Sequence, residues 1–170
     1  THAIGALSYV IASPSIGSDF STTRTNDHLA QLAIDANRFW PRGNGDRVFL
    51  VANGGTSFDN HPLPTEQFEL GRPFRLGAYD EGAVRGDHYG VLTGGYLKRV
   101  GRLPDFIGGP AYFGGWVEAG SAFDTFDAMR GRADLGLGGI FNTIVGPGVL
   151  AGSVAADGNW RIYVRIGRLF

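Results

Sequence analysis

The sequence predicts an all-β protein, a meander of about eight antiparallel strands, on three observations. Apolar and polar residues alternate with a period of two along most of the chain, as in strands with one apolar and one polar face. Gly, Pro, Asn or Asp interrupt the alternation roughly every ten to fifteen residues, which marks turns between strands. Glycine supplies 28 of the 170 residues, against ~7% in average proteins, and this favours turns and closely packed strands over helices.

The first part of the chain is expected to hold three strands, separated by a polar loop and a tight turn. The loop covers residues 13–27, and the turn at 41–46 is rich in Pro, Gly, Asn and Asp. Within the second strand, apolar residues such as Ile34 alternate with polar ones such as Asp35. The three strands are expected at residues 2–12, 28–40 and 47–55.

Residues 56–87 form the longest stretch without regular alternation, and they are too many for an ordinary connection between two strands. Such a stretch is either functional or disordered. Its Phe, Leu and Tyr content argues against disorder. An ordered loop is therefore expected between the third and fourth strands.

Five more strands are expected in the second part of the chain. The facing of the first of them is ambiguous, because Thr93 and Tyr96 sit on opposite sides of a glycine pair. In the next, Val117 lies on the apolar face and Glu118 on the polar face. The five strands are expected at residues 88–99, 110–121, 131–141, 148–156 and 160–170.

The last strand alternates most clearly, and it poses the question of what the apolar face meets. A soluble sheet would cover a core with that face, whereas a membrane barrel would turn it to lipid and line a lumen with the polar face. Alternation alone does not choose between them. The apolar face holds Trp160, Ile162, Val164, Ile166 and Phe170, and the other face holds Arg161, Tyr163, Arg165 and Gly167.

Three features favour the membrane. Glycines on the polar faces, such as Gly136 and Gly138, leave little from which to build a soluble core there. Aromatic residues such as Trp40 and Trp160 lie at strand ends, where a bilayer places its interfacial belts. Long and short connections alternate, as in outer-membrane barrels, except for the short last hairpin at Asp157. We therefore expect an antiparallel transmembrane β-barrel in a bacterial outer membrane.

Three stretches resemble the bacterial surface antigen superfamily of outer-membrane assembly and translocation barrels, in the version fused to patatin-like phospholipases. The first is the ending 163–170, which looks like a C-terminal signal for the barrel assembly machinery. The second, 68–79, is similar to the segment that contains the Val-Arg-Gly-Phe/Tyr motif of the family. The third, 86–99, looks like the strand that follows this loop.

The resemblance implies that residues 1–170 form a single partial domain, the second half of a sixteen-stranded barrel, with the loop at 56–87 folded into the lumen. It implies a non-enzymatic translocator or anchor for an upstream passenger, such as a patatin-like lipase. Its partners would be the lipid bilayer, the assembly machinery, and the passenger or missing barrel half. The implied lumen-loop residues are Phe68, Leu70, Gly71, Arg75, Leu76, Gly77, Ala78, Tyr79, Arg85 and Gly86. The implied assembly signal comprises Trp160, Ile162, Val164, Ile166, Gly167 and Phe170.

The chain departs from the family pattern at two positions of the loop. Gly77 stands in place of the motif arginine, and Arg72 in place of the second glycine of the preceding pair. We expect Arg75 or Arg85 to substitute for the motif arginine, with Glu118 as the salt-bridge partner. A guanidinium beside an inward carboxylate favours bidentate contact.

No cofactor, metal or catalytic site is expected from the sequence. The Gly-x-Ser-x-Gly motif of patatin-like enzymes is absent. His2, His28, His61 and His88 lack zinc-like spacing. Asp124 and Asp127 are expected in a solvated loop, because a calcium hand needs a glycine and a twelfth-position glutamate that are missing. A formal charge of -1 offers no field for nucleic acid.

Two alternatives to the half barrel remain open from the sequence. Eight strands could close on themselves as a complete small outer-membrane barrel, in which the first and last strands would pair. A loop of ~30 residues would not fit the narrow interior of such a barrel. A soluble binding barrel of lipocalin type would instead keep its apolar side and its ligand inside.

Overall fold

The structure, a computed structural model, describes residues 4–12, 31–58, 65–104 and 108–167, and it is built of strands. An eight-stranded antiparallel sheet has the strand order β1-β2-β3-β6-β7-β8-β9-β10, and β4 pairs with β5 in a second sheet. The strands are β1 (Ile4–Ala12), β2 (Gln31–Pro41), β3 (Arg47–Ser57), β4 (Phe68–Leu70), β5 (Val84–Gly86), β6 (His88–Arg102), β7 (Gly108–Phe123), β8 (Arg132–Thr143), β9 (Gly146–Ala155) and β10 (Trp160–Ile166). The prediction of an all-β antiparallel meander is confirmed.

Each of the eight expected strands occurs, with its ends shifted by a few residues. β6 and β7 run further than expected because they pair with each other along their length, apart from one irregularity between Arg99 and Gly101. The short strands β4 and β5 were not expected, since three residues are too few to give a period. Two short 3₁₀ turns, Gly43–Gly45 and Phe126–Ala128, lie in connections. In the described part of the chain, no helix is long and apolar enough to span a bilayer.

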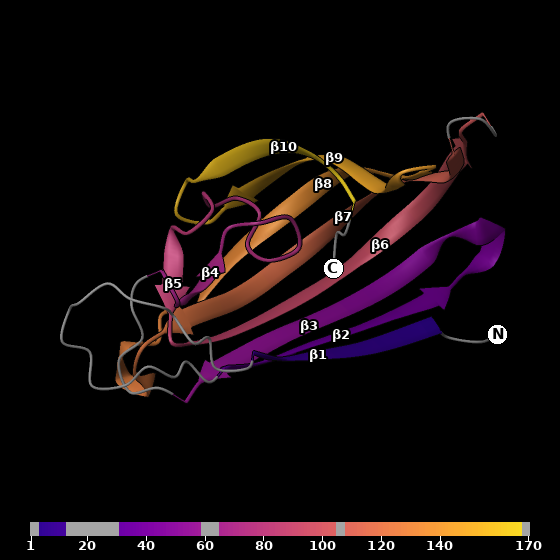
Figure 1. The fold of residues 1–170 in the computed structure, drawn as a ribbon. Helices are drawn as coiled ribbons and strands as arrows, with labels where there is room; N and C mark the ends of the chain where they lie inside the picture. The colour runs from indigo at the N-terminus through magenta and orange to yellow at the C-terminus, as the bar shows by residue number, and fades with distance from the viewer. Residues whose placement is uncertain (1–3, 13–30, 59–64, 105–107, 168–170) are drawn as a thin grey trace.

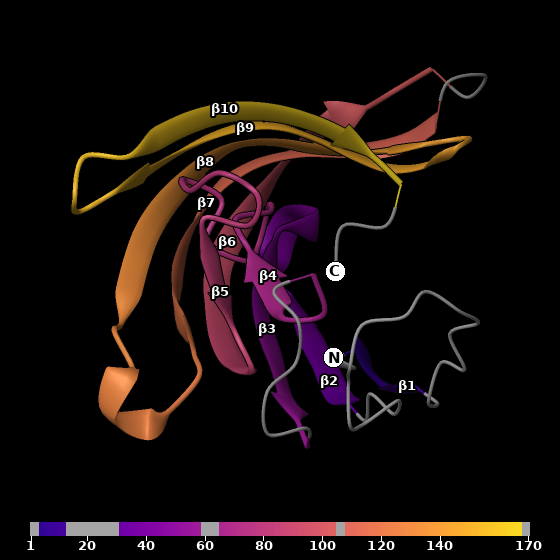
Figure 2. The same cartoon turned by 60° about the vertical axis from the view of Figure 1, so that its left-hand side comes forward.

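The main sheet is strongly curved and open. Figure 2 shows it arching from β1 to β10 around the segment that carries β4 and β5. β1 and β10 are the two edges of the sheet and do not pair with each other in the described residues. This arrangement does not match the alternative of a complete eight-stranded barrel, which requires that pairing.

The convex face of the sheet is apolar and exposed. Ile162 and Val164 on β10 are 69% and 68% exposed, while Tyr163 between them is buried. The same pattern crosses the sheet, because paired residues of neighbouring strands share a face. One such row contains Leu50, Gly94, Val117, Leu135, Val154 and Trp160.

The concave face is mixed and buried. One row across it contains Val51, Thr93, Glu118, Asp134 and Ala155, and every one of these residues is buried. Larger apolar side chains of this face, such as Phe49 and Trp116, form a core with Phe74 from the segment between β3 and β6. The core therefore lies between the concave face and that segment, with the apolar convex face left uncovered.

The connections differ in length between the two ends of the sheet. At one end, residues 42–46, 103–107 and 144–145 join neighbouring strands. At the other end, the connections are residues 13–30, 58–87, 124–131 and 156–159. The expected asymmetry is present, with the expected exception at 156–159.

Candidate functional site

The candidate site is the contact between the concave face and the inner loop, the name used here for residues 65–87. This loop lies between β3 and β6 in the sequence, forms the hairpin of β4 and β5, and leads into β6 (Figure 1). Its residues Leu70, Leu76 and Val84 are buried in one cluster with Tyr89 and Val91 of β6. The expected ordered loop at 56–87 is thus present over its described part, and it lies inside the curve of the sheet (Figure 2).

Glu118 is the centre of this contact, and its side chain is fully buried. One carboxylate oxygen accepts hydrogen bonds from the main-chain N–H of Phe74 at 3.2 Å and from the indole Nε1 of Trp116 at 2.8 Å. The other oxygen accepts from the main-chain N–H groups of Leu76 and, at 3.2 Å, of Gly77. Four donors thus satisfy a buried carboxylate, three of them from the inner loop.

Neighbouring polar residues of the sheet continue this pattern along the loop. Asp134 accepts a hydrogen bond from the main-chain N–H of Ala78 at 2.8 Å. Thr93 donates its hydroxyl to the carbonyl of Phe74 at 3.0 Å. Arg161 of β10 donates to the carbonyls of Gly71 at 3.0 Å and Tyr79 at 3.1 Å. The sheet therefore binds the main chain of the loop, and it fixes the loop's path rather than a particular side chain.

The backbone of the loop adopts unusual conformations to make these contacts. Phe74 and Leu76 have φ values of 63° and 64°, in the left-handed region that non-glycine residues rarely adopt. Packing offsets this strain, because the Phe74 ring lies 4.8 Å from the Trp116 ring and 6.0 Å from the Phe49 ring, centroid to centroid. This conformation turns the N–H groups of Phe74, Leu76 and Gly77 towards Glu118, a geometry that suits an anion.

Gly71 is the position where the loop tolerates a side chain least. Its φ is +105°, and a Cβ atom there would lie 2.0 Å from the carbonyl oxygen of Asp80. We expect Gly71→Ala to lower the free energy of unfolding by about 1–3 kcal/mol and to expose the loop to protease. Gly43→Ala is the control, because a Cβ at Gly43 meets nothing within 4 Å. Equal stability of the two variants would contradict this role.

The expected arginine pairing with Glu118 is wrong. Arg75 forms an ion pair with Asp35 of β2 at 2.5 Å, and Arg85 forms one with Glu69 at 3.0 Å within the β4–β5 hairpin. Glu118 has no arginine partner among the described residues, since main-chain N–H groups and an indole already fill both of its oxygens.

Gly77, where the resemblance led us to note a missing arginine, explains how the loop comes so close. A Cβ atom at Gly77 would lie 3.1 Å from the hydroxyl oxygens of both Ser153 and Tyr163. An arginine there would have to displace these side chains. Without one, the main chain approaches near enough for its own N–H to reach the carboxylate of Glu118.

The ion pair between Arg75 and Asp35 is a second, weaker attachment of the loop. It is partly buried, Asn53 also donates to Asp35 at 2.6 Å, and the Arg75 guanidinium lies 5.8 Å from the Tyr89 ring centroid. In a double-mutant cycle of Arg75→Gln and Asp35→Asn, we expect a coupling energy of about 0.5–2 kcal/mol from denaturant unfolding. Additive effects would show that the pair contributes nothing.

At the rim of the sheet, a third cluster joins the loop to the last hairpin. Tyr79 donates its hydroxyl to Asp157 at 2.9 Å, and Arg132 lies 3.4 Å from the same carboxylate. A hydrogen bond from the Asn159 side chain, helped by the one from Tyr79, holds the pKa of Asp157 below its usual value. Desolvation and the bond to Asp157 raise the pKa of Tyr79. At neutral pH, Asp157 is therefore ionised and Tyr79 is neutral, so the tyrosine hydroxyl donates to a carboxylate.

The remaining residues predicted for the loop contribute to its packing. Phe68 packs on Tyr89 with ring centroids 4.8 Å apart, and Ala78 is buried in the same cluster. A Cβ at Gly86 would lie 2.3 Å from the main-chain nitrogen of Phe123, so this glycine allows β5 to approach β7.

The expected assembly-signal residues lie along β10. Trp160, Ile162, Val164 and Ile166 are all exposed on its convex side. Gly167, with φ +114°, follows the strand and donates its N–H to the carbonyl of Pro147 at 2.8 Å. Phe170 lies outside the described residues.

Sequence reasoning missed several groups that hold the loop, namely Asp35, Asn53, Thr93 and Asp134. Alternation placed Asp35 and Asp134 on polar faces, whereas the facing of Thr93 was ambiguous and Asn53 was assigned to no face. Which of these residues meet the loop depends on the register between strands, and alternation within one strand does not reveal that register.

No cluster of three or more His, Asp or Glu side chains suited to a metal occurs among the described residues. His88 instead shares a hydrogen bond of 2.8 Å with Thr56 and packs on the Phe123 ring. Asp124 accepts hydrogen bonds from the Gln67 side chain and the Asp87 N–H. His2, His28 and His61 lie outside the described residues.

Comparison with known proteins identifies no relative. No protein-family model matches the chain, and no curated protein matches it significantly.

Proposed function

We propose that this chain is the second half of a sixteen-stranded outer-membrane β-barrel of the surface antigen type, a translocator or anchor for an upstream passenger domain. The single observation that carries the proposal is the distribution of side chains over the sheet. Apolar side chains cover the exposed convex face, while carboxylates and hydroxyls are buried on the concave face. A water-soluble sheet keeps its apolar side covered, and a barrel in lipid reverses that arrangement.

The open edges support the view that further strands complete the barrel. β1 and β10 each leave one row of main-chain N–H and C=O groups without a partner strand among the described residues. Each unpaired group in hydrocarbon costs several kcal/mol, by order of magnitude, so an open sheet does not span a bilayer. A second set of strands that pairs with both edges would remove that cost.

The position of the inner loop supports a barrel whose lumen is partly closed. It contacts the concave face through Glu118 of β7, Asp134 of β8 and Arg161 of β10, three different strands of the second half of the sheet. In a larger barrel these contacts would keep the loop inside the lumen. A loop fixed in this way would restrict passage through the barrel and stiffen its wall.

The soluble lipocalin-like alternative requires the opposite distribution of side chains. Its apolar residues would line the inside and bind a ligand there. Instead, the concave face carries buried Asn53, Thr93 and Ser153 beside its carboxylates, and the apolar side chains of the convex face are exposed. The apolar residues that the concave face does carry, such as Phe49 and Trp116, pack against Phe74 of the inner loop.

Site-directed spin labelling of the full-length protein in bacterial outer membranes tests the proposal. The chain has no cysteine, so single cysteines introduced into it give single labels in this region. Labels at Leu135 and Leu137 on the convex side should be relaxed by oxygen, which dissolves in lipid, and not by a water-soluble nickel chelate. A label at Arg132, on the concave side, is the matched control and should respond to the nickel chelate. Equal nickel accessibility at all three positions would overturn the membrane assignment.

A further inference from the structure

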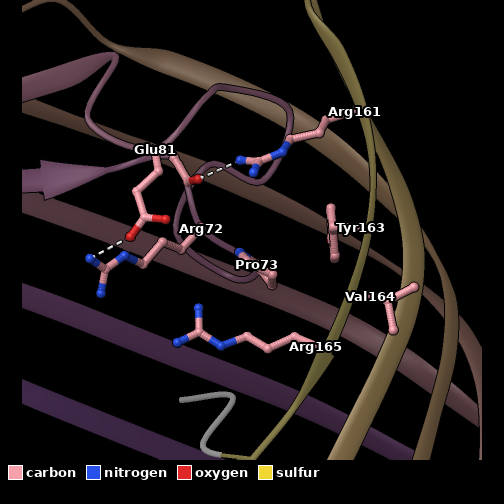
Figure 3. A pocket seen from close by; sticks show the side chains of 8 residues that line it. Arg72, Pro73, Glu81, Arg161, Tyr163, Val164 and Arg165 are labelled. Atoms are coloured by element: carbon pink, nitrogen blue, oxygen red, sulfur yellow. Dashed lines mark hydrogen bonds and ion pairs between the residues drawn. The ribbon is translucent and has the colours of Figure 1, made fainter.

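A pocket of about 320 Å³ lies between the inner loop and β10. It is open on one side and is lined by Gly71, Arg72, Pro73 and Glu81 of the loop and by Arg161, Tyr163, Val164 and Arg165 of β10 (Figure 3). We propose that this pocket binds a small oxyanion, a phosphate or carboxylate group. The proposal concerns a ligand that the translocator or anchor role does not require.

The charges around the pocket are unbalanced. Three arginines, Arg72, Arg161 and Arg165, face a single glutamate, Glu81, in the lining. The whole chain carries a formal charge of -1, so this positive charge is local. Guanidinium groups suit phosphate and carboxylate, because their planar donors match two oxygens at once.

The three arginines are used to different extents within the protein. Arg161 donates to the carbonyls of Gly71 and Tyr79, which holds it against the loop. Arg72 forms an ion pair with Glu81 at 2.6 Å, yet its Nε atom is buried without a hydrogen-bond partner in the described structure. Arg165 makes no ion pair with any described residue. Arg165 therefore has donors free for a ligand, while Arg72 can offer its guanidinium to one by exchanging its contact with Glu81.

The fold brings these donors into one space. Arg161, Tyr163 and Arg165 alternate along β10, so all three side chains point to the concave side of the sheet. Figure 3 shows Arg72 and Arg165 extending in the same direction below Glu81, with Arg161 turned to the loop backbone. A volume near the ~300 Å³ lower bound of ligand pockets suits a small group rather than a whole cofactor.

Glu81 acts as an internal competitor in this arrangement. Its carboxylate occupies Arg72 in the absence of ligand, at a site where both side chains are partly exposed. An incoming oxyanion would take over part of that contact. Removing the glutamate charge should therefore strengthen binding, whereas removing Arg165 should weaken it, and these opposite signs distinguish a binding site from a merely structural cluster.

Binding of inorganic phosphate and pyrophosphate to the full-length protein in detergent, measured by isothermal titration calorimetry at low ionic strength, tests the proposal. We expect saturable binding that Arg165→Gln weakens about 10- to 100-fold, the effect of one lost hydrogen bond to a charged group. Glu81→Gln should tighten binding, and added salt should weaken it. Arg42→Gln, in the exposed turn before β3, is the matched control and should bind as wild type.

A second arm identifies the source of the oxyanion. Vesicles that contain phosphatidic acid, compared with neutral vesicles, test a lipid phosphate against the free ion. Tighter binding to either probe with Glu81→Gln supports the pocket. Absence of binding by both probes, or weaker binding with Glu81→Gln, overturns it. Either result leaves the spin-label pattern of the barrel unaffected, so failure of the pocket is distinguishable from failure of the membrane assignment.

Discussion

Replacing Glu118 with glutamine is expected to detach the inner loop from the sheet and to lower the free energy of unfolding by about 2–6 kcal/mol. The substitution keeps the shape of the side chain but turns one of its two oxygens into an NH₂ group. Each oxygen of Glu118 accepts two hydrogen bonds, from Phe74 and Trp116 or from Leu76 and Gly77. Whichever way the amide turns, two buried donors lose their acceptor, at about 1–3 kcal/mol each.

The measurement is denaturant unfolding of the full-length protein in detergent, combined with limited proteolysis of the folded state. Cleavage within residues 65–87 should become faster in Glu118→Gln while the strands stay protected. Glu69→Gln is the control, because Glu69 pairs with Arg85 at the partly exposed β4–β5 hairpin. We expect a change of about 1 kcal/mol or less from that surface pair. A loop that stays protected in Glu118→Gln would show that its apolar contacts alone hold it.

The sequence predicted the strands well because their signal is local. Alternation from Trp160 to Ile166 is visible in seven residues, and it gave the correct faces of β10. The turn after Pro41 and the hairpin at Asp157 were likewise marked by residues that turns require. Each of these features depends on a few neighbouring residues, and no distant contact can change them.

The attachment of the loop was not predictable in the same way, because it depends on pairs far apart in the sequence. Arg75 meets Asp35 across forty positions, and the strand register, not the local sequence, brings the two together. The prediction of an arginine partner for Glu118 was wrong for a further reason. Sequence reasoning considered side-chain partners, whereas the loop presents its main-chain N–H groups, which every residue but proline carries.

The two faces of the sheet differ in how they are covered. Burial of Glu118 is tolerable because loop N–H groups reach both of its oxygens, and one oxygen of Asp134 is reached in the same way, so the loop and the carboxylates depend on each other. The convex face has no comparable cover within the described residues. Whether the convex face meets water or lipid decides in which medium the chain is stable. A single substitution on this face distinguishes the two media.

Leu135→Arg is that substitution. Leu135 lies on the convex face of β8, between Val117 and Val154 of the neighbouring strands, and it is 55% exposed. In a membrane barrel, an arginine on the lipid-facing side makes folding into lipid less favourable, by about 2–4 kcal/mol at the bilayer midplane. In a water-soluble sheet, a charge at such an exposed position changes stability by only about 0.5 kcal/mol or less.

Refolding of the full-length protein into phospholipid vesicles measures this difference, with the heat-dependent gel shift of folded barrels as the readout. Met129→Arg is the matched control, since Met129 is 56% exposed but lies in the connection between β7 and β8. We expect Leu135→Arg to fold less completely at every denaturant concentration and Met129→Arg to fold as wild type. Equal folding of both variants would mean that the convex face does not meet hydrocarbon, because lipid cannot solvate a guanidinium as water does.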